Sequence, residues 1–263
     1  MLGALLISLT GSRPNLRESV TLATGGILFL VVASIVPSVL DGGRPEVEVL
    51  EVMPGLALAF KVEPLGMLFS LVASGLWIVT SLYAIGYMRG HHEKNQTRFY
   101  VFFAVAISAA LGVAFARNMF TLFIFYEMLT LSTYPLVTHH RSEDAKRSGR
   151  IYMGILMSTS IGLLLLGMIW SWHLTGTLEF TPGGILEGKA SSTIIGVLLA
   201  LYAFGTGKAA LMPFHRWLPA AMVAPTPVSA LLHAVAVVKA GVFTVMKVVV
   251  YLFGTDLLSS TGL

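Results

Sequence analysis

The sequence has no cysteine among its 263 residues, and charged residues make up only 11% of it. Without cysteine the chain can form no disulfide, no iron–sulfur cluster and no thiolate zinc site. A soluble domain carries about 25% charged residues, so this low charge content excludes an ordinary soluble protein. Hydrophobic residues make up 56% of the sequence, which excludes a disordered chain.

The sequence also lacks the motifs of several function classes. No basic run is interleaved with aromatic residues, so nucleic acid is not an expected partner. No phosphate-binding loop, nucleophile–base pair or metal-ligand cluster is evident. The pairs His91–His92 and His139–His140 are interpreted as residues of the membrane interface. We therefore expect no metal and no cofactor to bind this chain.

Long apolar runs dominate the sequence instead. A membrane-spanning helix needs about 20 mostly apolar residues. Seven segments meet this requirement, namely 19–40, 64–88, 99–116, 119–138, 151–173, 192–212 and 227–253. Residues 1–10 are apolar but too few to span a membrane, and they are interpreted as part of a further helix. The prediction is an all-α polytopic membrane protein with about seven transmembrane helices and a partial first helix.

The loops between these segments differ in their content of Lys and Arg. If the loop 11–18 is cytoplasmic, the loops on the cytoplasmic side hold ten Lys and Arg residues and those on the opposite side hold four. Cytoplasmic loops of membrane proteins carry the excess of these residues. The count therefore predicts that the loops 90–98 and 141–150 face the cytoplasm and that the loop 41–63 lies outside.

Four charged residues remain inside the apolar segments: Glu127, Lys208, Lys239 and Lys247. Each costs at least about 2.5–3.5 kcal/mol at the bilayer centre, so a functional role is the default hypothesis. Glu127 has no charged neighbour in its own segment, and its partner should come from another helix. Lys208 precedes Pro213, which removes a backbone hydrogen bond and disrupts the helix. The lysine should therefore lie where the helix opens to water.

The last apolar segment holds two of these four charged residues, Lys239 and Lys247, and one histidine, His233. His233 titrates near neutral pH and could relay a proton, although a satisfied core histidine is an equal interpretation. Lys239 is central in the segment. Lys247 is nearer its outer end, and we expect its side chain to reach the interface. A carboxylate that moves towards or away from Lys208 would switch that lysine between holding and releasing a proton.

Two runs of the sequence, residues 125–137 and 207–234, closely resemble one family. It comprises the antiporter-like membrane subunits shared by complex I, Mrp-type cation/proton antiporters and membrane-bound hydrogenases. The resemblance covers the chain from about residue 9 to its end. It implies that Glu127 pairs with Lys208, and that Lys208 lies in a helix that is broken at residues 211–214, around Pro213. It also implies that His233 or Lys239 is the relay.

The resemblance divides the chain into two parts. Residues 1–98 would hold the N-terminal helices, and residues 99–263 would form one five-helix half-channel repeat that contains the broken helix. Members of the family have a second, inverted repeat, which these residues do not include. The sequence is therefore interpreted either as a fragment or as a split subunit completed by a separate chain.

These observations predict a multi-pass subunit of a multisubunit ion-translocating complex in a prokaryotic plasma membrane. It would conduct protons, or exchange protons for sodium, through Glu127, Lys208, His233 and Lys239. Its partners would be the lipid bilayer and other membrane subunits, including a chain with the second repeat. Redox chemistry would belong to partner subunits of an NADH–quinone oxidoreductase-like or hydrogenase-like complex. The alternative is a structural or docking subunit without transport of its own.

Overall fold

The structure, a computed structural model, describes residues 1–53 and 55–262, apart from the side chains of residues 53 and 234. The helices are α1 (Leu2–Leu9), α2 (Pro14–Leu40), α3 (Pro64–Gly90), α4 (Gln96–Ala114), α5 (Met119–Val137), α6 (Glu143–Thr159), α7 (Leu165–Thr175), α8 (Ser192–Gly205), α9 (Trp217–Ala221), α10 (Thr226–Ala230), α11 (Val237–Lys247) and α12 (Thr255–Thr261). Short 3-10 or π-helical turns join several of them, namely η1 (Ser160–Leu164), η2 (Gly207–Ala209), η3 (Phe214–Arg216), η4 (Leu231–Val235) and η5 (Val248–Phe253).

The all-α polytopic prediction is confirmed. Within the described residues six helices are long and apolar enough to cross a membrane. Two of them are composite, because α6, η1 and α7 form one run of 33 residues and α10 to η5 form another of 28. The predicted span 192–212 is shorter than expected, since α8 ends at Gly205 after 14 residues. The apolar start of the chain forms the short helix α1.

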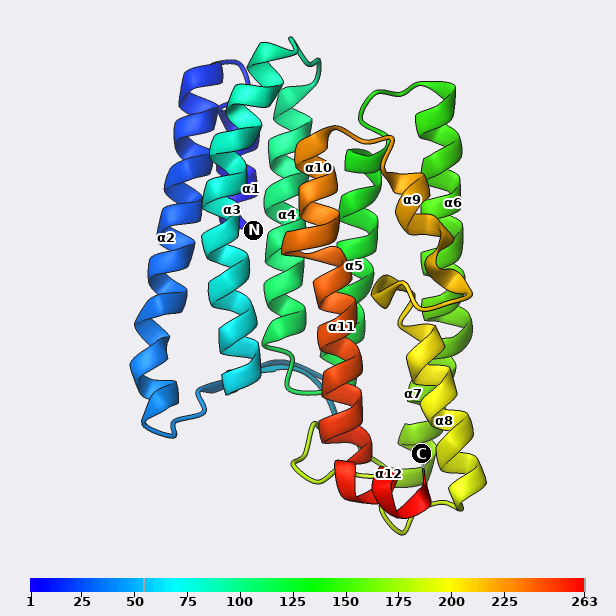
Figure 1. Cartoon of the computed structure of the whole chain (residues 1–263). Helices are drawn as coiled ribbons and strands as arrows, with labels where there is room; N and C mark the ends of the chain where they lie inside the picture. Colours follow the sequence, from blue (N-terminus) through cyan, green and yellow to red (C-terminus); the bar gives the residue numbers. More distant parts are fainter. Residues whose placement is uncertain (54, 263) are drawn as a thin grey trace.

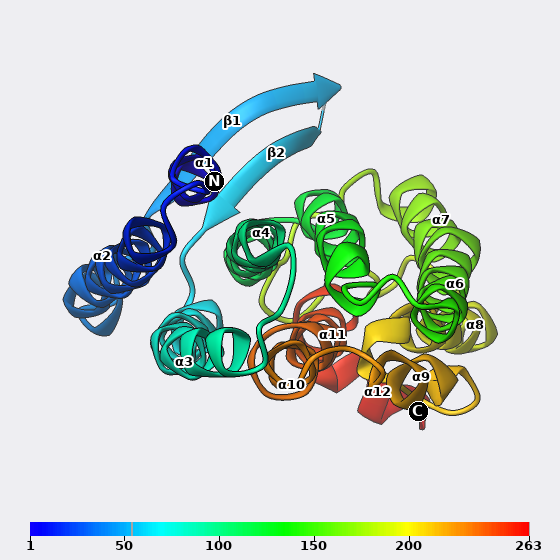
Figure 2. The same ribbon diagram turned by 90° about the horizontal axis from the view of Figure 1, so that it is seen from above.

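Helix α4 lies at the centre of the bundle. It contacts α1, α3, α5 and α11, as the view from above shows (Figure 2). Its inner residues are largely alanine and glycine, which let neighbouring helices approach closely. A Cβ on Gly112 would lie 2.2 Å from Cδ1 of Phe125, so this helix–helix contact requires glycine.

A two-stranded antiparallel sheet lies at the level of the lower end of the helices in Figure 1, which we call the hairpin end, and Figure 2 shows it to one side of the bundle. Strand β1 (Glu46–Met53) pairs with β2 (Leu56–Lys61), with Glu46 opposite Lys61. The hairpin is tied to the loop between α4 and α5, because the amide of Lys61 donates to the Phe115 carbonyl at 2.7 Å. The prediction of a plain loop at 41–63 missed this sheet.

Lys247 lies at the hairpin end, and the expectation that it reaches the interface is wrong. Its ammonium donates to Oε2 of Glu63 at 2.6 Å and to the Ala116 carbonyl at 3.2 Å. Lys247 is 1% exposed and Glu63 is 6% exposed. A segment distant in sequence packs beside the lysine, because the amide of Thr181 donates to the carbonyl of Tyr251, four residues after Lys247. The result is a buried ion pair that joins α11 to the start of α3.

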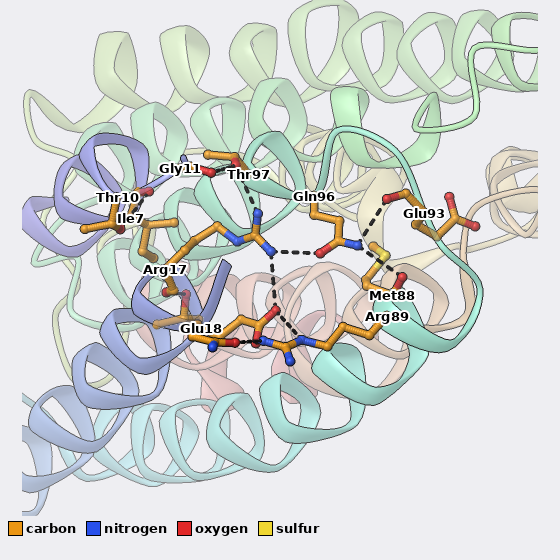
Figure 3. A network of polar contacts seen from close by, with 12 residues as sticks. Ile7, Thr10, Gly11, Arg17, Glu18, Met88, Arg89, Glu93, Gln96 and Thr97 are labelled. Atoms are coloured by element: carbon orange, nitrogen blue, oxygen red, sulfur yellow. Dashed lines mark hydrogen bonds and ion pairs between the residues drawn. The ribbon is translucent and has the colours of Figure 1, made fainter. Parts of the chain in front are cut away.

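The opposite end carries the loops rich in Lys and Arg, and we call it the basic end. A polar network fixes the ends of α2, α3 and α4 there (Figure 3). The Arg17 guanidinium donates to Gln96 at 2.8 Å and to Thr97 at 3.2 Å, and Glu18 pairs with Arg89. Arg17 and Glu18, expected in the loop 11–18, are buried in the first turns of α2.

Candidate functional site

Lys208 lies in a break in the bundle where α8 stops. A Cβ on Gly205 would lie 2.4 Å from the backbone nitrogen of Leu164, and one on Gly207 would lie 2.2 Å from Oγ1 of Thr159. Only glycine permits so close an approach. The chain leaves the α-helix after Gly205 and forms the 3-10 turn η2, which contains Lys208.

The non-helical segment is wider than the predicted break at residues 211–214. It begins at Thr206 and continues, apart from η2, to Pro213, where the turn η3 starts. The proline therefore lies within the break, but the glycines before Lys208 mark its beginning. Trp217, fully buried, braces the segment because its indole Nε1 donates to the Gly207 carbonyl at 2.9 Å.

The Lys208 side chain is completely buried against α5. Its Nζ donates to the Tyr126 carbonyl at 2.8 Å and to Oγ1 of Thr130 at 2.5 Å. Nζ also lies 3.2 Å from the centroid of the Tyr126 ring, a cation–π contact. The backbone amide of Lys208 donates to the Tyr126 hydroxyl at 3.0 Å. Neutral oxygens and one aromatic face thus surround the ammonium.

Glu127 does not form the direct ion pair that the resemblance implies. Among the described residues, no ion pair joins its carboxylate to Lys208, and neither carboxylate oxygen has a hydrogen-bond partner. Tyr126 and Thr130 share one face of α5, whereas Glu127 is rotated by about 100° from Tyr126. Glu127 lines a groove of about 590 Å³ between α4 and α5, together with Phe102 and Met128, although both of its carboxylate oxygens are buried.

The remaining two predicted residues lie in different environments on the last span. His233 is half-buried in η4, and its Nε2 has no hydrogen-bond partner among the described residues. Lys239 is exposed and lines a groove of about 320 Å³ between α3 and α11, beside Phe69 and Val242. The structure therefore does not bring Lys239 to Lys208.

Helix α11 nevertheless packs directly against the break. A Cβ on Gly241 would lie 2.3 Å from the backbone nitrogen of Ala209 and 2.4 Å from the carbonyl carbon of Lys208. This glycine was missed by the sequence reasoning, because nothing in its own segment distinguishes it. The contact places α11, which follows the turn that holds His233, directly against the Lys208 turn.

Four buried hydroxyls lie on α5 and on the neighbouring helix α6. Thr130 accepts from the ammonium, and the hydroxyls of Thr133 and Tyr152 are hydrogen-bonded to each other. Tyr126, Thr130, Thr133 and Tyr152 are each fully buried. Sequence reasoning also missed these residues, although the spacing 126, 130 and 133 places three of them on one helical face. Hydroxyls can both donate and accept, so this arrangement can pass a proton.

Two family descriptions match the chain. The family described as NADH:quinone oxidoreductase/Mrp antiporter, TM, matches residues 116–259, and the description NADH-Ubiquinone oxidoreductase (complex I), chain 5 N-terminus, matches residues 55–100. The first match covers more than half of the chain and includes the Lys208 break.

Curated relatives agree with these matches. A putative antiporter subunit mnhA2 of Staphylococcus saprophyticus is 33% identical over 236 residues, which is 84% of this chain and 29% of that protein. An NAD(P)H-quinone oxidoreductase chain 5 of Picosynechococcus sp. is 32% identical over 201 residues, which is 73% of this chain and 30% of the relative. The chain thus spans less than a third of the length of these relatives.

Two solved structures share the fold. A chain of the archaeal membrane-bound sulfane sulfur reductase aligns with a TM-score of 0.80 at 22% identity, covering 93% of this chain and 50% of that one. A chain of the Mrp complex from Dietzia sp. aligns with a TM-score of 0.78 at 22% identity, covering 94% and 46%. The chain corresponds in length to about half of each.

Proposed function

The chain belongs to the NADH:quinone oxidoreductase/Mrp antiporter membrane-subunit family, and from this membership we propose that it conducts protons within a multisubunit ion-translocating complex of the plasma membrane. The observation that carries the proposal is the burial of Lys208 at a helix break, where, among the described residues, its ammonium donates only to neutral oxygens. A charge in such a place is costly, so the lysine can release its proton as well as hold it.

Glu127 is the proposed switch for this proton. Its two carboxylate oxygens have no hydrogen-bond partner among the described residues, and it adjoins Tyr126, whose carbonyl accepts from Lys208. A carboxylate near the ammonium favours the charged lysine, and its withdrawal or protonation favours the neutral amine. Side-chain motion of Glu127 between its groove and the α5–Lys208 contact would therefore load and unload the lysine.

His233 and Lys239 are the proposed onward groups, with different roles. The helix that carries both packs against the Lys208 turn at Gly241. His233 is half-buried and has a free ring nitrogen among the described residues, which suits a relay inside this chain. Lys239 faces outward, which suits transfer to a partner subunit with the second repeat. Exchange of protons for sodium would use Glu127 together with Lys208, because Na⁺ and a proton would compete for the negative charge of the carboxylate.

The test is the transport activity of the assembled complex with substitutions at Lys208. Lys208→Ala should abolish proton pumping, or sodium-dependent pH change, in membrane vesicles while assembly persists. Lys208→Arg should restore little, because guanidinium does not deprotonate in proteins. Lys146→Ala is the matched control, since Lys146 is exposed and, among the described residues, forms an ion pair only with Glu143 on the same helix. Full transport by an assembled Lys208→Ala complex would contradict the proposal and favour a structural or docking subunit.

A further inference from the structure

Four histidines and one glutamate line a single cavity of about 460 Å³ at the basic end. The residues are His91, His92, Glu93, His139 and His140, which come from the loop between α3 and α4 and the loop after α5. The proposed relay uses none of them. Their gathering was not evident in the sequence, where the two histidine pairs are 48 positions apart and were interpreted as interface residues.

Glu93 lies between two of the imidazoles. Its Oε2 is 3.6 Å from Nε2 of His139 and 3.6 Å from Nδ1 of His140. His139 is only 3% exposed, and neither of its ring nitrogens has a hydrogen-bond partner among the described residues. The side chain of His140 is 37% exposed. A buried imidazole beside a carboxylate that water can reach is suited to taking up a proton and passing it inward.

Burial and nearby charges together favour the neutral imidazole of His139. Burial lowers the pKa of His139 most, Arg98 and His140 lower it further, and Glu93 and the backbone of Lys94 raise it. Arg98, on α4, donates to the His139 carbonyl at 3.0 Å, and Arg141 lines the same cavity. A lowered pKa favours the neutral imidazole, so a proton that arrives at His139 is readily released.

The loop that carries Glu93 is held in place rather than free. Nε2 of Gln96 donates to the carbonyls of Glu93 and Met88, each at 3.1 Å, and Oε1 of Gln96 accepts from Arg17 (Figure 3). His92 has a φ of +51°, in the left-handed region that costs a non-glycine residue free energy. The network thus fixes a sharp turn that presents Glu93 to His139.

Buried hydroxyls extend from Lys208 towards this cavity. Thr130 is in contact with the Lys208 ammonium, and Thr133, hydrogen-bonded to Tyr152, is three residues closer to the basic end. Three residues of helix rise about 4.5 Å, and α5 ends at Val137, so the chain leaves the helix between Thr133 and His139. The hydroxyls of Thr130 and Thr133 donate to the carbonyls of Tyr126 and Leu129 rather than to each other, so the proposed path needs bridging water in both intervals.

We propose that Glu93 and His139 form the proton-entry site for Lys208, with Thr133, Tyr152 and Thr130 as the path between them. This inference rests on the proposed function, because it supplies the protons that Lys208 is proposed to hold. A proton would pass from cytoplasmic water to the Glu93–His139 pair, and then through bridging water and the hydroxyls to the neutral amine of Lys208. Each step breaks and forms only O–H or N–H bonds.

The test uses vesicles of the assembled complex with the basic end facing the medium, at low buffer concentration. His139→Asn and Glu93→Gln should each slow proton uptake by about 10-fold or more, as expected for loss of a positioned proton-transfer group. Millimolar imidazole in the medium should restore most of the rate, because a small buffer can deliver protons past the missing group. A purely structural role for His139 would give no such rescue.

Two comparisons make the result specific. His173→Asn changes an exposed histidine near the hairpin end and should leave the rate unchanged with or without imidazole. Lys208→Ala should not be rescued by imidazole, so loss of the relay and loss of the entry site give different results. Glu93→Gln, in a loop, provides the test even if His139→Asn prevents assembly.

Either of two results would overturn the entry site. One is an unchanged rate of His139→Asn and Glu93→Gln at low buffer concentration, and the other is a reduced rate that imidazole does not raise in the assembled complex. If Lys208→Ala proves fully active, the relay is wrong, and the imidazole response of His139→Asn still tests the entry site by itself.

Discussion

Replacing the buried Lys247 should destabilise the protein by about 3–5 kcal/mol, the usual cost of breaking a buried ion pair by removing one partner. Lys247→Met keeps an unbranched apolar side chain but leaves the Glu63 carboxylate, 6% exposed, without its cation. The Ala116 carbonyl loses a donor at 3.2 Å, and the Phe180 ring loses a cation 4.4 Å from its centroid. These losses act together, so the effect should lie in the upper part of the range.

A double-mutant cycle separates the pair from its surroundings. Glu63→Gln, Lys247→Met and the double variant are compared by the free energy of unfolding of the purified protein, measured in mixed micelles with increasing SDS. Because both single variants lose the same contact, the double variant should cost less than their sum. The coupling should be about 3 kcal/mol, at the upper end for residues in direct contact.

Lys189→Met is the control, because Lys189 is an exposed lysine in the loop between α7 and α8. It should change the free energy of unfolding by no more than about 0.5 kcal/mol. An equally small effect of Lys247→Met would show that this lysine reaches bulk water, which would refute the reasoning. A coupling near zero would show that Glu63 and Lys247 do not interact.

Two further predictions concern packing and orientation. Gly241→Ala should lower the free energy of unfolding by about 1–3 kcal/mol, because the added Cβ would lie 2.3 Å from the Ala209 backbone nitrogen. Thermal unfolding measures this change. Gly86→Ala is the control, because nothing lies within 4 Å of a Cβ at that position. Single cysteines in the loop 91–95 should react with an impermeant reagent only from the cytoplasmic side, and their labelling in intact cells would reverse the orientation.

The membrane spans could be predicted from the sequence because length and apolar content alone decide whether a helix crosses a bilayer. Tertiary contacts set the details that were missed. The hairpin lies in the segment 41–63, which is rich in charged residues and for that reason was predicted to be a loop. Its first strand, β1, nevertheless alternates Glu and Val with the period of a strand. Arg17 and Glu18 were predicted to lie in a loop because charged residues usually flank a membrane-spanning segment rather than lie within it. The structure shows that the network with Arg89 and Gln96 lets them enter the helix.

The part of the candidate site that could be predicted is the buried charge, because its energetic cost can be recognised from its own apolar segment alone. Lys208 stands out in any apolar run, whatever surrounds it, because burying a charge is expensive. The side of α5 that the lysine meets depends instead on how closely the break approaches α6 and α11, which Gly207 and Gly241 determine through contacts distant in sequence. For this reason Tyr126 and Thr130 were missed as its hydrogen-bond acceptors.

The exposure of Lys239 bears on how one repeat could serve in transport. A lysine in lipid near the bilayer centre costs at least about 2.5–3.5 kcal/mol, and the groove around Lys239 is lined mainly by apolar side chains. A partner subunit that covers the groove between α3 and α11 with a carboxylate or with ordered water would remove this cost. His233, by contrast, lies in η4 and is half-buried within this chain. The resemblance leaves the relay open between these two residues, and their positions assign them different steps: His233 would act before the proton leaves this chain, and Lys239 would act where it enters the next.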